Sequence, residues 1–169
     1  MQNDLQKMEN EPTAVICFLG DIFLGNTKPR ITAALAEVLQ DSDHRIANLE
    51  TPISEPAPID SNKILLRSSP GCETILQELG IDVVSVANNH IFDHGKQGFE
   101  ATRNALDNMS IQYVGAGDDI VQASTPLLFE IHGIRFGLIA ATEEGTQALI
   151  AQASSCGCNT LEQGSILRQ

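Results

Sequence analysis

The sequence predicts an α/β fold with a mainly parallel sheet, and three observations lead to that prediction. Apolar segments of strand length alternate along the chain with amphipathic segments of helical length. Strands that are separated by helices of ten or more residues are joined by right-handed crossovers, which make neighbouring strands parallel. At 169 residues with 42% hydrophobic residues, the chain has the length and apolar content of one domain.

The individual elements follow from local patterns. The predicted strands cover residues 13–20, 45–50, 81–87 and 111–117, and the predicted helices cover residues 30–42, 68–80 and 95–109. The run TAVICFLG at 13–20 is continuously apolar, which is typical of a strand buried on both faces. The segment 30–42 has apolar residues at helical spacing, namely Ile31, Leu35, Val38 and Leu39.

Caps and turns support the later elements. Ser69 and Pro70 read as the start of the helix at 68–80, and Gly80 as its end. The helix at 95–109 is amphipathic, with Phe99, Leu106 and Met109 on one face. Residues 125–142 contain two apolar runs around His132 and Gly133, which predict a β-hairpin. Residues 144–153 are expected to be able to form a helix, and no strand is predicted after them.

Charge and cysteine content limit the classes of function. The formal net charge of −12 disfavours binding to nucleic acid or to anionic lipid headgroups, although acidity also serves solubility alone. The four cysteines lack zinc-knuckle spacing and are expected to be mostly reduced thiols. No apolar run is long enough for a signal sequence or a membrane span, so the chain as written is expected to be cytoplasmic.

Polar residues stand at the predicted carboxyl ends of three strands. Gly20-Asp21 ends the first, Asn48 to Glu50 end the second, and Asn88 to His90 end the third. Ligands of open α/β sheets bind beyond these ends, so these side chains are expected to converge. Carboxylate, amide and imidazole groups suit Mn, Zn, Fe or Mg, and two such ions would activate water for a phosphoryl displacement.

Each of these residues also has a purely structural interpretation. Asp21 could cap a turn, Glu50 could be a solvated loop acid, and Asn88 could brace its loop through its amide. Asp93 is either the N-cap of the next helix or a carboxylate that orients a histidine. Gly95 is expected to serve a tight turn. The remaining histidines are expected on the surface or in loops: His44, His94 and His132.

Three segments, taken in order, resemble the CapA family of capsule and poly-γ-glutamate synthesis proteins. They are GDIFLG at 20–25, NLETPIS at 48–54, and residues 79–117, which contain ANNHIFDHG and GAG. The resemblance covers about Val15 to Ala141. It implies a fold related to calcineurin-like metallophosphoesterases, an α/β/β/α sandwich, of which this chain carries the N-terminal half.

The resemblance also implies roles for individual residues. Asp21, Glu50 and Asn89 match positions that would hold metal, and His90 matches a general acid or phosphate-contacting group. Asp93 and Gly95 fit the end of the same motif, with Asn48 and Asn88 bracing the loops. The implied cofactor is a divalent metal ion, namely Mn, Zn, Fe or Mg. This chain is expected to bind two such ions, one ion or none.

The family's later histidine motifs have no counterpart here, because no histidine follows His132. We therefore expect a mobile lead at 1–12, a partial family domain at 13–143 and a divergent tail at 144–169. The expected activity is hydrolysis of a phosphate-containing or other anionic substrate, completed by self-association or by a partner that supplies the missing half. The alternatives are a non-catalytic subunit of a polymer synthesis or export assembly and a non-functional fragment.

Overall fold

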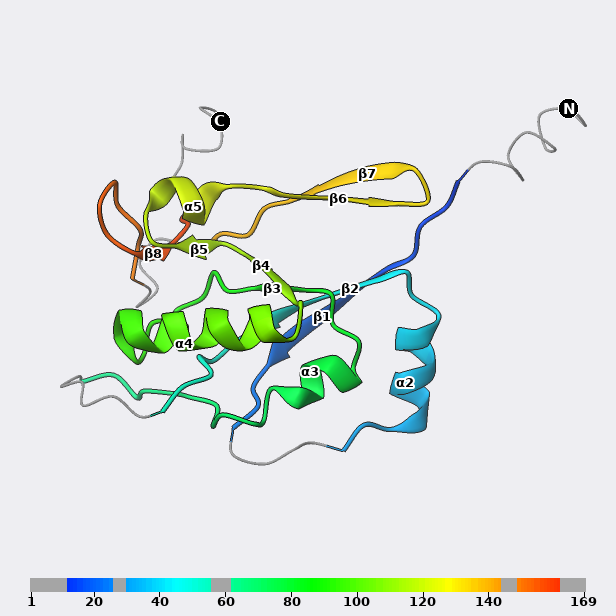
Figure 1. The fold of residues 1–169 in the computed structure, drawn as a ribbon, viewed down its shortest axis with the longest axis horizontal. Helices are drawn as coiled ribbons and strands as arrows, with labels where there is room; N and C mark the ends of the chain where they lie inside the picture. The colour runs from blue at the N-terminus through cyan, green and yellow to red at the C-terminus, as the bar shows by residue number, and fades with distance from the viewer. Residues whose placement is uncertain (1–11, 26–29, 56–61, 144–148, 162–169) are drawn as a thin grey trace, which may run out of the picture.

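A computed structural model describes residues 12–25, 30–55, 62–143 and 149–161 (Figure 1). The principal sheet is parallel and has the strand order β1 (Ile16–Ile22), β2 (His44–Leu49), β3 (Val83–Ser85), β4 (Gln112–Val114). Two antiparallel pairs accompany it: β5 (Ala116–Gly117) with β8 (Gly157–Cys158), and β6 (Leu127–Ile131) with β7 (Ile134–Leu138). The helices are α2 (Ala33–Gln40), α3 (Thr74–Glu78), α4 (Gly95–Asn108) and α5 (Ile120–Ser124). The predicted α/β class and parallel sheet are confirmed, and they are consistent with a metallophosphoesterase-like fold.

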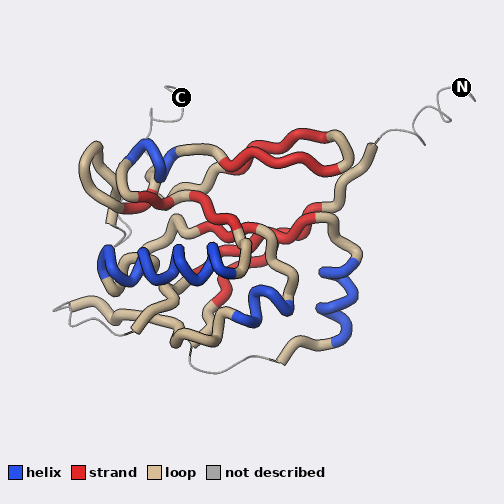
Figure 2. Tube along the Cα trace, viewed as in Figure 1, coloured by secondary structure: helices blue, strands red, loops and turns tan. Residues whose placement is uncertain are grey.

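The two faces of the sheet are covered differently. Helices α3 and α4 lie on one side and the β6–β7 hairpin lies on the other, as Figures 1 and 2 show. Alternate residues of β3 serve the two layers: Val84 packs into the cluster with the helices, whereas Val83 packs beneath the hairpin. The alternation explains why this strand reads as a continuous apolar run.

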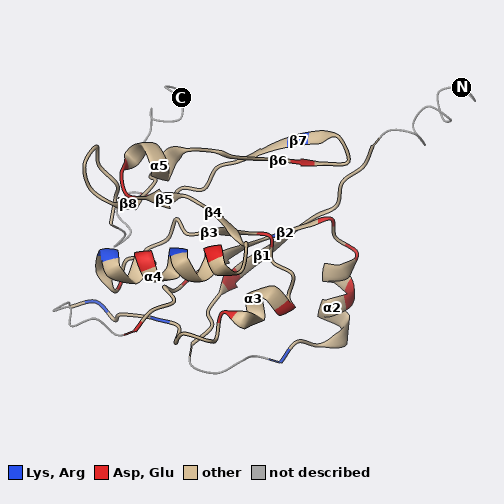
Figure 3. Ribbon diagram, viewed as in Figure 1, with Lys and Arg blue, Asp and Glu red and all other residues tan. Residues whose placement is uncertain are grey.

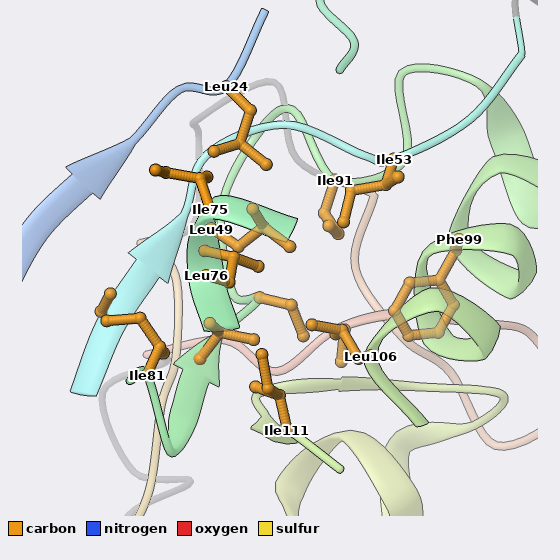
Figure 4. Packing of buried hydrophobic residues seen from close by; sticks show 14 of the residues in the cluster. Leu24, Leu49, Ile53, Ile75, Leu76, Ile81, Ile91, Phe99, Leu106 and Ile111 are labelled. Atoms are coloured by element: carbon orange, nitrogen blue, oxygen red, sulfur yellow. The ribbon is translucent and has the colours of Figure 1, made fainter. Parts of the chain in front are cut away.

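The main core lies between the sheet and the two helices (Figure 4). Leu49 from β2, Leu76 from α3, and Phe99 and Leu106 from α4 are completely buried there. Burying a side chain of this size stabilises a fold by roughly 1.5–3 kcal/mol. The predicted apolar face of α4 is confirmed, because Phe99 and Leu106 are buried and Met109 packs against the same cluster.

The first predicted strand is present, but the prediction that it is buried on both faces is wrong. Among the strands of the described residues, β1 is an edge of the principal sheet and pairs only with β2. Within β1, Phe18 is 67% exposed, and Val15 and Phe23 beside it are also exposed. Helix α2 shows the same departure, because Leu39 is buried while Leu35 and Val38 are exposed. An apolar run cannot reveal whether a second layer covers it.

The helix predicted at 68–80 is shorter than expected. Helix α3 begins at Thr74, after a turn in which the Cys72 N–H donates to the Ser69 carbonyl. Gly71 has a φ of +96°, a conformation that a right-handed helix cannot contain, so Ser69 and Pro70 start a turn and not the helix. Gly80 closes the helix as predicted, with a φ of +64°.

The C-terminal segment also differs from the prediction. Residues 149–153 are not helical, and 144–148 lie outside the described residues. An unpredicted strand, β8, pairs with β5 and places Cys158 in the main core. The two-residue strand GC has no periodicity from which it could be predicted.

Four further expectations concern the hairpin, the cysteines, membrane spans and the N-terminus. The hairpin at 125–142 is confirmed, and its turn residues His132 and Gly133 both have positive φ, as tight hairpin turns require. All four cysteines are free. Across the ranges that the structure describes, none of the helices has the length and apolarity that crossing a membrane requires. The N-terminal segment expected to be mobile lies almost wholly outside the described residues.

Candidate functional site

The carboxyl ends of the parallel strands bring the predicted site residues together. Asp21 in β1 stands opposite Asn48 in β2, which in turn stands opposite Ser85 in β3. An irregularity in β1 produces this alignment, because Phe18 pairs with Ile46 three residues before Asp21 but only two before Asn48. The extra residue is a β-bulge, a device that re-aims the side chains that follow it.

An amide joins the two carboxylates of the site. The Asn48 Nδ2 group donates to Asp21 Oδ1 at 2.8 Å and to Glu50 Oε2 at 3.0 Å. Glu50 is fixed by its backbone, because its N–H donates to the Ile22 carbonyl at the end of β1. Both carboxylates therefore lie within hydrogen-bonding distance of one point, which here holds an amide nitrogen.

His90 lies next to Glu50 and is held by Asp93. The His90 Nε2 atom is 3.9 Å from Glu50 Oε1, and its Nδ1 atom is 2.7 Å from Asp93 Oδ2. Because the ionised Asp93 carboxylate only accepts hydrogen bonds, Nδ1 is the donor in this pair. Of the two sequence-based interpretations of Asp93, the structure shows the histidine contact. The N-cap position of α4 is occupied by His94.

The loop after β3 is braced by Asn88. Its Oδ1 atom accepts hydrogen bonds from the backbone N–H groups of His90 and Ile91 at 3.0 and 2.9 Å, and its Nδ2 group donates to the Leu49 carbonyl and to Asn48 Oδ1. The Cys158 thiol lies beneath the loop and donates to the Asn88 carbonyl at 3.3 Å. Burial raises the pKa of this thiol to about 12, so Cys158 is neutral and acts as a packing residue.

Lys63 belongs to this cluster, and the sequence analysis missed it. Its Nζ group contacts Asp93 Oδ1 at 2.6 Å and donates to the Asn89 carbonyl. The backbone N–H of Leu66 donates to Asp93 Oδ2 at 2.7 Å, so this loop closes over the carboxylate. Lys63 follows a proline-rich segment of the sequence without hydrophobic periodicity, and no local pattern indicates its distant partners.

The electrostatics of the site centre on Glu50. Desolvation by burial, followed by repulsion from Asp21, raises the pKa of the Glu50 carboxyl, while His90 and the Asn48 hydrogen bond oppose that rise. Two carboxylates that face one point repel each other unless a positive charge lies between them. The arrangement therefore favours a cation at this end of the sheet.

The other predicted residues are less closely tied to the cluster. Asn89 is half-buried and contacts Lys63 through its backbone carbonyl. Gly95 has a φ of +63°, which suits the turn into α4. His94 is buried, and burial lowers its pKa, so its expected surface location is wrong. His44 stacks on Phe129 at 4.3 Å, whereas His132 lies exposed at the hairpin tip.

The donor set can be compared with what a divalent metal needs. Within the described ranges, no group of three or more His, Cys, Asp or Glu residues is arranged to hold a metal ion. Two carboxylates do converge, however, on a point that is also reached by an amide side chain that could present its oxygen. Carboxylate and amide oxygens suit Mg or Mn, so Asp21, Asn48 and Glu50 fit part of a hard-cation site.

Comparison with known proteins gives a consistent match. The sequence model of the family described as "Bacterial capsule synthesis protein PGA_cap" matches residues 8–165. This range includes most of the segment 144–169, and the division of the chain at residues 12 and 143 stays a prediction.

Individual relatives carry related names. The "Capsule biosynthesis protein CapA" of Bacillus anthracis is 25% identical over 175 aligned positions, which cover 95% of this chain and 42% of the relative. The "PGA biosynthesis protein CapA" of Bacillus subtilis (strain 168) is 22% identical over 83% of this chain and 40% of the relative. A "Probable polyglutamine synthesis accessory protein" of Mycobacterium tuberculosis is 35% identical over 62% of this chain and 28% of the relative. The chain thus spans about two fifths of the length of the Bacillus relatives.

Proposed function

We propose, because this chain belongs to the PGA_cap family of bacterial capsule synthesis proteins, that it takes part in the synthesis of a capsule polymer of the poly-γ-glutamate type. The names of the Bacillus relatives support this assignment, and the match extends over most of the chain. Since the chain spans only part of those relatives, its activity, substrate and partners are all part of the proposal.

The proposed chemistry is metal-assisted hydrolysis of a phosphate-containing or other anionic substrate. Asp21, Glu50 and Asn89 would hold a divalent ion, which when bound supplies positive charge and lowers the pKa of a water molecule. His90 would transfer a proton through Nε2, the ring nitrogen that faces Glu50. Asp93 would fix the ring by accepting from Nδ1. The observation that carries the proposal is the shared contact of Asp21 and Glu50 with a single amide nitrogen.

Metal binding tests this assignment directly. We expect the purified chain to bind Mn²⁺ weakly in calorimetry, and we expect Asp21→Ala or Asn89→Ala to abolish the binding. Asp118→Ala is a suitable control. It also removes one carboxylate, but Asp118 forms its ion pairs with Lys96 and Arg103 of α4. Unchanged binding in both site variants would remove the site assignment.

The proposed domain organisation places a partial family domain at 13–143. Completion of the site would then require residues from outside this range, which a partner or a second copy of the chain could supply. We expect measurable phosphoesterase activity only when such residues are supplied, for example by a co-expressed C-terminal portion of one of the Bacillus relatives. Activity of this chain alone at the same level would contradict that requirement.

A second candidate function is a non-catalytic accessory role in polymer synthesis. Two observations favour it: the Mycobacterium relative is named an accessory protein, and β1 presents Phe18 at an uncovered sheet edge. A stable, uniform oligomer that forms equally well with and without Mn²⁺ would support this role. An oligomer that forms only with the metal would favour the hydrolytic proposal.

A further inference from the structure

Asp93 is a buried carboxylate whose two oxygens already accept three hydrogen bonds. Its side chain is only 2% exposed. One oxygen accepts from Lys63, and the other accepts from His90 Nδ1 and from the Leu66 N–H. A metal ion that bound Oδ2 would have to displace the His90 ring or the Leu66 N–H, each of which donates to this oxygen at 2.7 Å.

Lys63 places a positive charge against the loop after β3. Its ammonium contacts two oxygen atoms from the loop after β3, the Asp93 carboxylate and the Asn89 carbonyl. Carboxylate and carbonyl oxygens are also the ligands that divalent ions use. The side chain is 16% exposed, so its charge is partly desolvated and anchored by these contacts.

The formal charges of the connected residues lead to the same conclusion. Asp21, Glu50 and Asp93 contribute −3 and Lys63 contributes +1, which gives −2 with His90 neutral. A single divalent ion would neutralise this set. Two divalent ions would leave a net +2 in a partly buried site, and electrostatic repulsion from the ammonium would oppose the second.

We propose that the Lys63 ammonium replaces a second metal ion, so that the site binds one divalent cation between Asp21 and Glu50. This inference rests on the proposed metal-binding function and specifies its stoichiometry. It departs from a two-ion phosphoesterase centre, and it assigns a role to a residue that no strand-end motif includes.

The test is the number of Mn²⁺ ions bound per chain, measured by calorimetry and elemental analysis, together with the electron paramagnetic resonance spectrum of the bound ion. We expect one ion in the wild-type chain, with the hyperfine pattern of isolated Mn²⁺. We expect Lys63→Met to bind a second ion, and Lys63→Arg to remain at one because it retains the charge. Lys96→Met is the matched control, because Lys96 is an exposed lysine of α4 and should leave the number at one.

The outcomes separate this inference from the proposed function. Two ions in the wild-type chain, with the spectrum of a coupled pair, would overturn it whether or not Lys63→Met folds. A folded Lys63→Met that still binds one ion would also overturn it. If the wild-type chain binds no Mn²⁺, the proposed metal function fails. If Lys63→Met then binds Mn²⁺, that binding would still support the inference that the ammonium replaces a metal ion. If Lys63→Met also binds no Mn²⁺, the inference would be refuted.

Discussion

Single residues of this site are held by unusually complete hydrogen bonding, and Asp93 is the clearest case. Its carboxylate connects Lys63 and the backbone N–H of Leu66, which come from a distant part of the sequence, with the His90 ring, which lies three residues before Asp93. Removing one member of a buried ion pair leaves the other charge desolvated, which makes such changes more damaging than the loss of an exposed pair.

We predict that Asp93→Asn lowers the free energy of unfolding by about 3 kcal/mol. The reason is that the neutral amide removes the negative charge that faces the Lys63 ammonium. It also brings an NH₂ group against one of the groups that now donate to the carboxylate. Urea unfolding followed by circular dichroism would measure the change. Asp118→Asn, which removes a partly exposed partner of Arg103, should change stability by less than about 1 kcal/mol. Equal losses in the two variants would contradict the structural role given to Asp93.

The raised pKa of the Glu50 carboxyl leads us to predict how the stability of the chain depends on pH. Because the pKa of this carboxyl is raised in the folded state, the folded chain binds more protons there than the unfolded chain between the two pKa values. Stability from this group is therefore highest below the ordinary carboxyl pKa and falls as the pH rises through the higher folded value. Glu50→Gln should remove that fall, which stabilises the chain near neutral pH by at most about 1 kcal/mol because Glu50 is partly exposed.

Thermal unfolding at pH 4 and pH 7 would check this prediction. Glu37→Gln on the exposed surface of α2 is a control for the loss of one negative charge. A larger stabilisation at pH 4 than at pH 7 would show that the sign is wrong.

The residues of the site could be predicted only where they follow the end of a predicted strand. Asp21, Asn48 and Glu50 follow apolar runs, and parallel strands bring such positions together. Lys63 could not be found in this way, because its contacts to Asn89 and Asp93 span 26 and 30 residues. The burial of His94 was missed for the same reason, since its ring hydrogen-bonds to the backbone of Leu66, much earlier in the chain.

At the scale of elements, the sequence predicts strands and helices better than it predicts their surroundings. The predicted strands at 45–50, 81–87 and 111–117 correspond to β2, β3 and β4, and the hairpin is present as predicted. The exposure of β1 and α2 depends on which layers surround them, and that information is not local. The helices differ in their charged residues. Helix α4 carries basic and acidic residues side by side, whereas the charged residues on α2 and α3 are acidic (Figure 3).

Strand β8 provides a test of how firmly the C-terminal segment is docked. A side chain at Gly157 would place its Cβ atom 2.3 Å from the Ala151 backbone nitrogen, which leaves no room for a methyl group. We therefore predict that Gly157→Ala destabilises the chain by about 1–3 kcal/mol, as overpacking does. Chemical denaturation would measure it, and Gly20→Ala, which meets nothing within 4 Å, should be nearly neutral. A neutral Gly157→Ala would mean that β8 does not dock on β5 in solution.

At the scale of the whole molecule, the described chain buries one side of its sheet well and leaves one edge uncovered. Phe18, Val15 and Phe23 are exposed on and beside β1, which is an edge strand of the sheet that the described residues form. Exposed apolar residues at an unprotected sheet edge favour association with another chain. The same edge is therefore the part of the molecule most suited to the partner or second copy proposed above.

We predict that the wild-type chain self-associates at high concentration and that Phe18→Lys shifts it toward the monomer. A lysine on an edge strand opposes edge-to-edge pairing through its charge and its hydration. Sedimentation velocity over a range of concentrations would measure the shift. Val121→Lys changes an equally exposed apolar residue on α5 and should leave association unchanged. A similar shift in both variants would indicate general solubility and not an interface at β1.

The bulge in β1 means that the pairing of this site tolerates a change in the length of the strand. If the ladder ran regularly from Phe18 through the present sequence, Gly20 would stand opposite Asn48, and Asp21 would stand opposite Leu49. Deletion of Gly20 would bring Asp21 opposite Asn48 in a regular ladder that needs no bulge. When homologous chains are aligned, a gap at this point is therefore compatible with the site, whereas a substitution of Asp21 removes one of its two carboxylates.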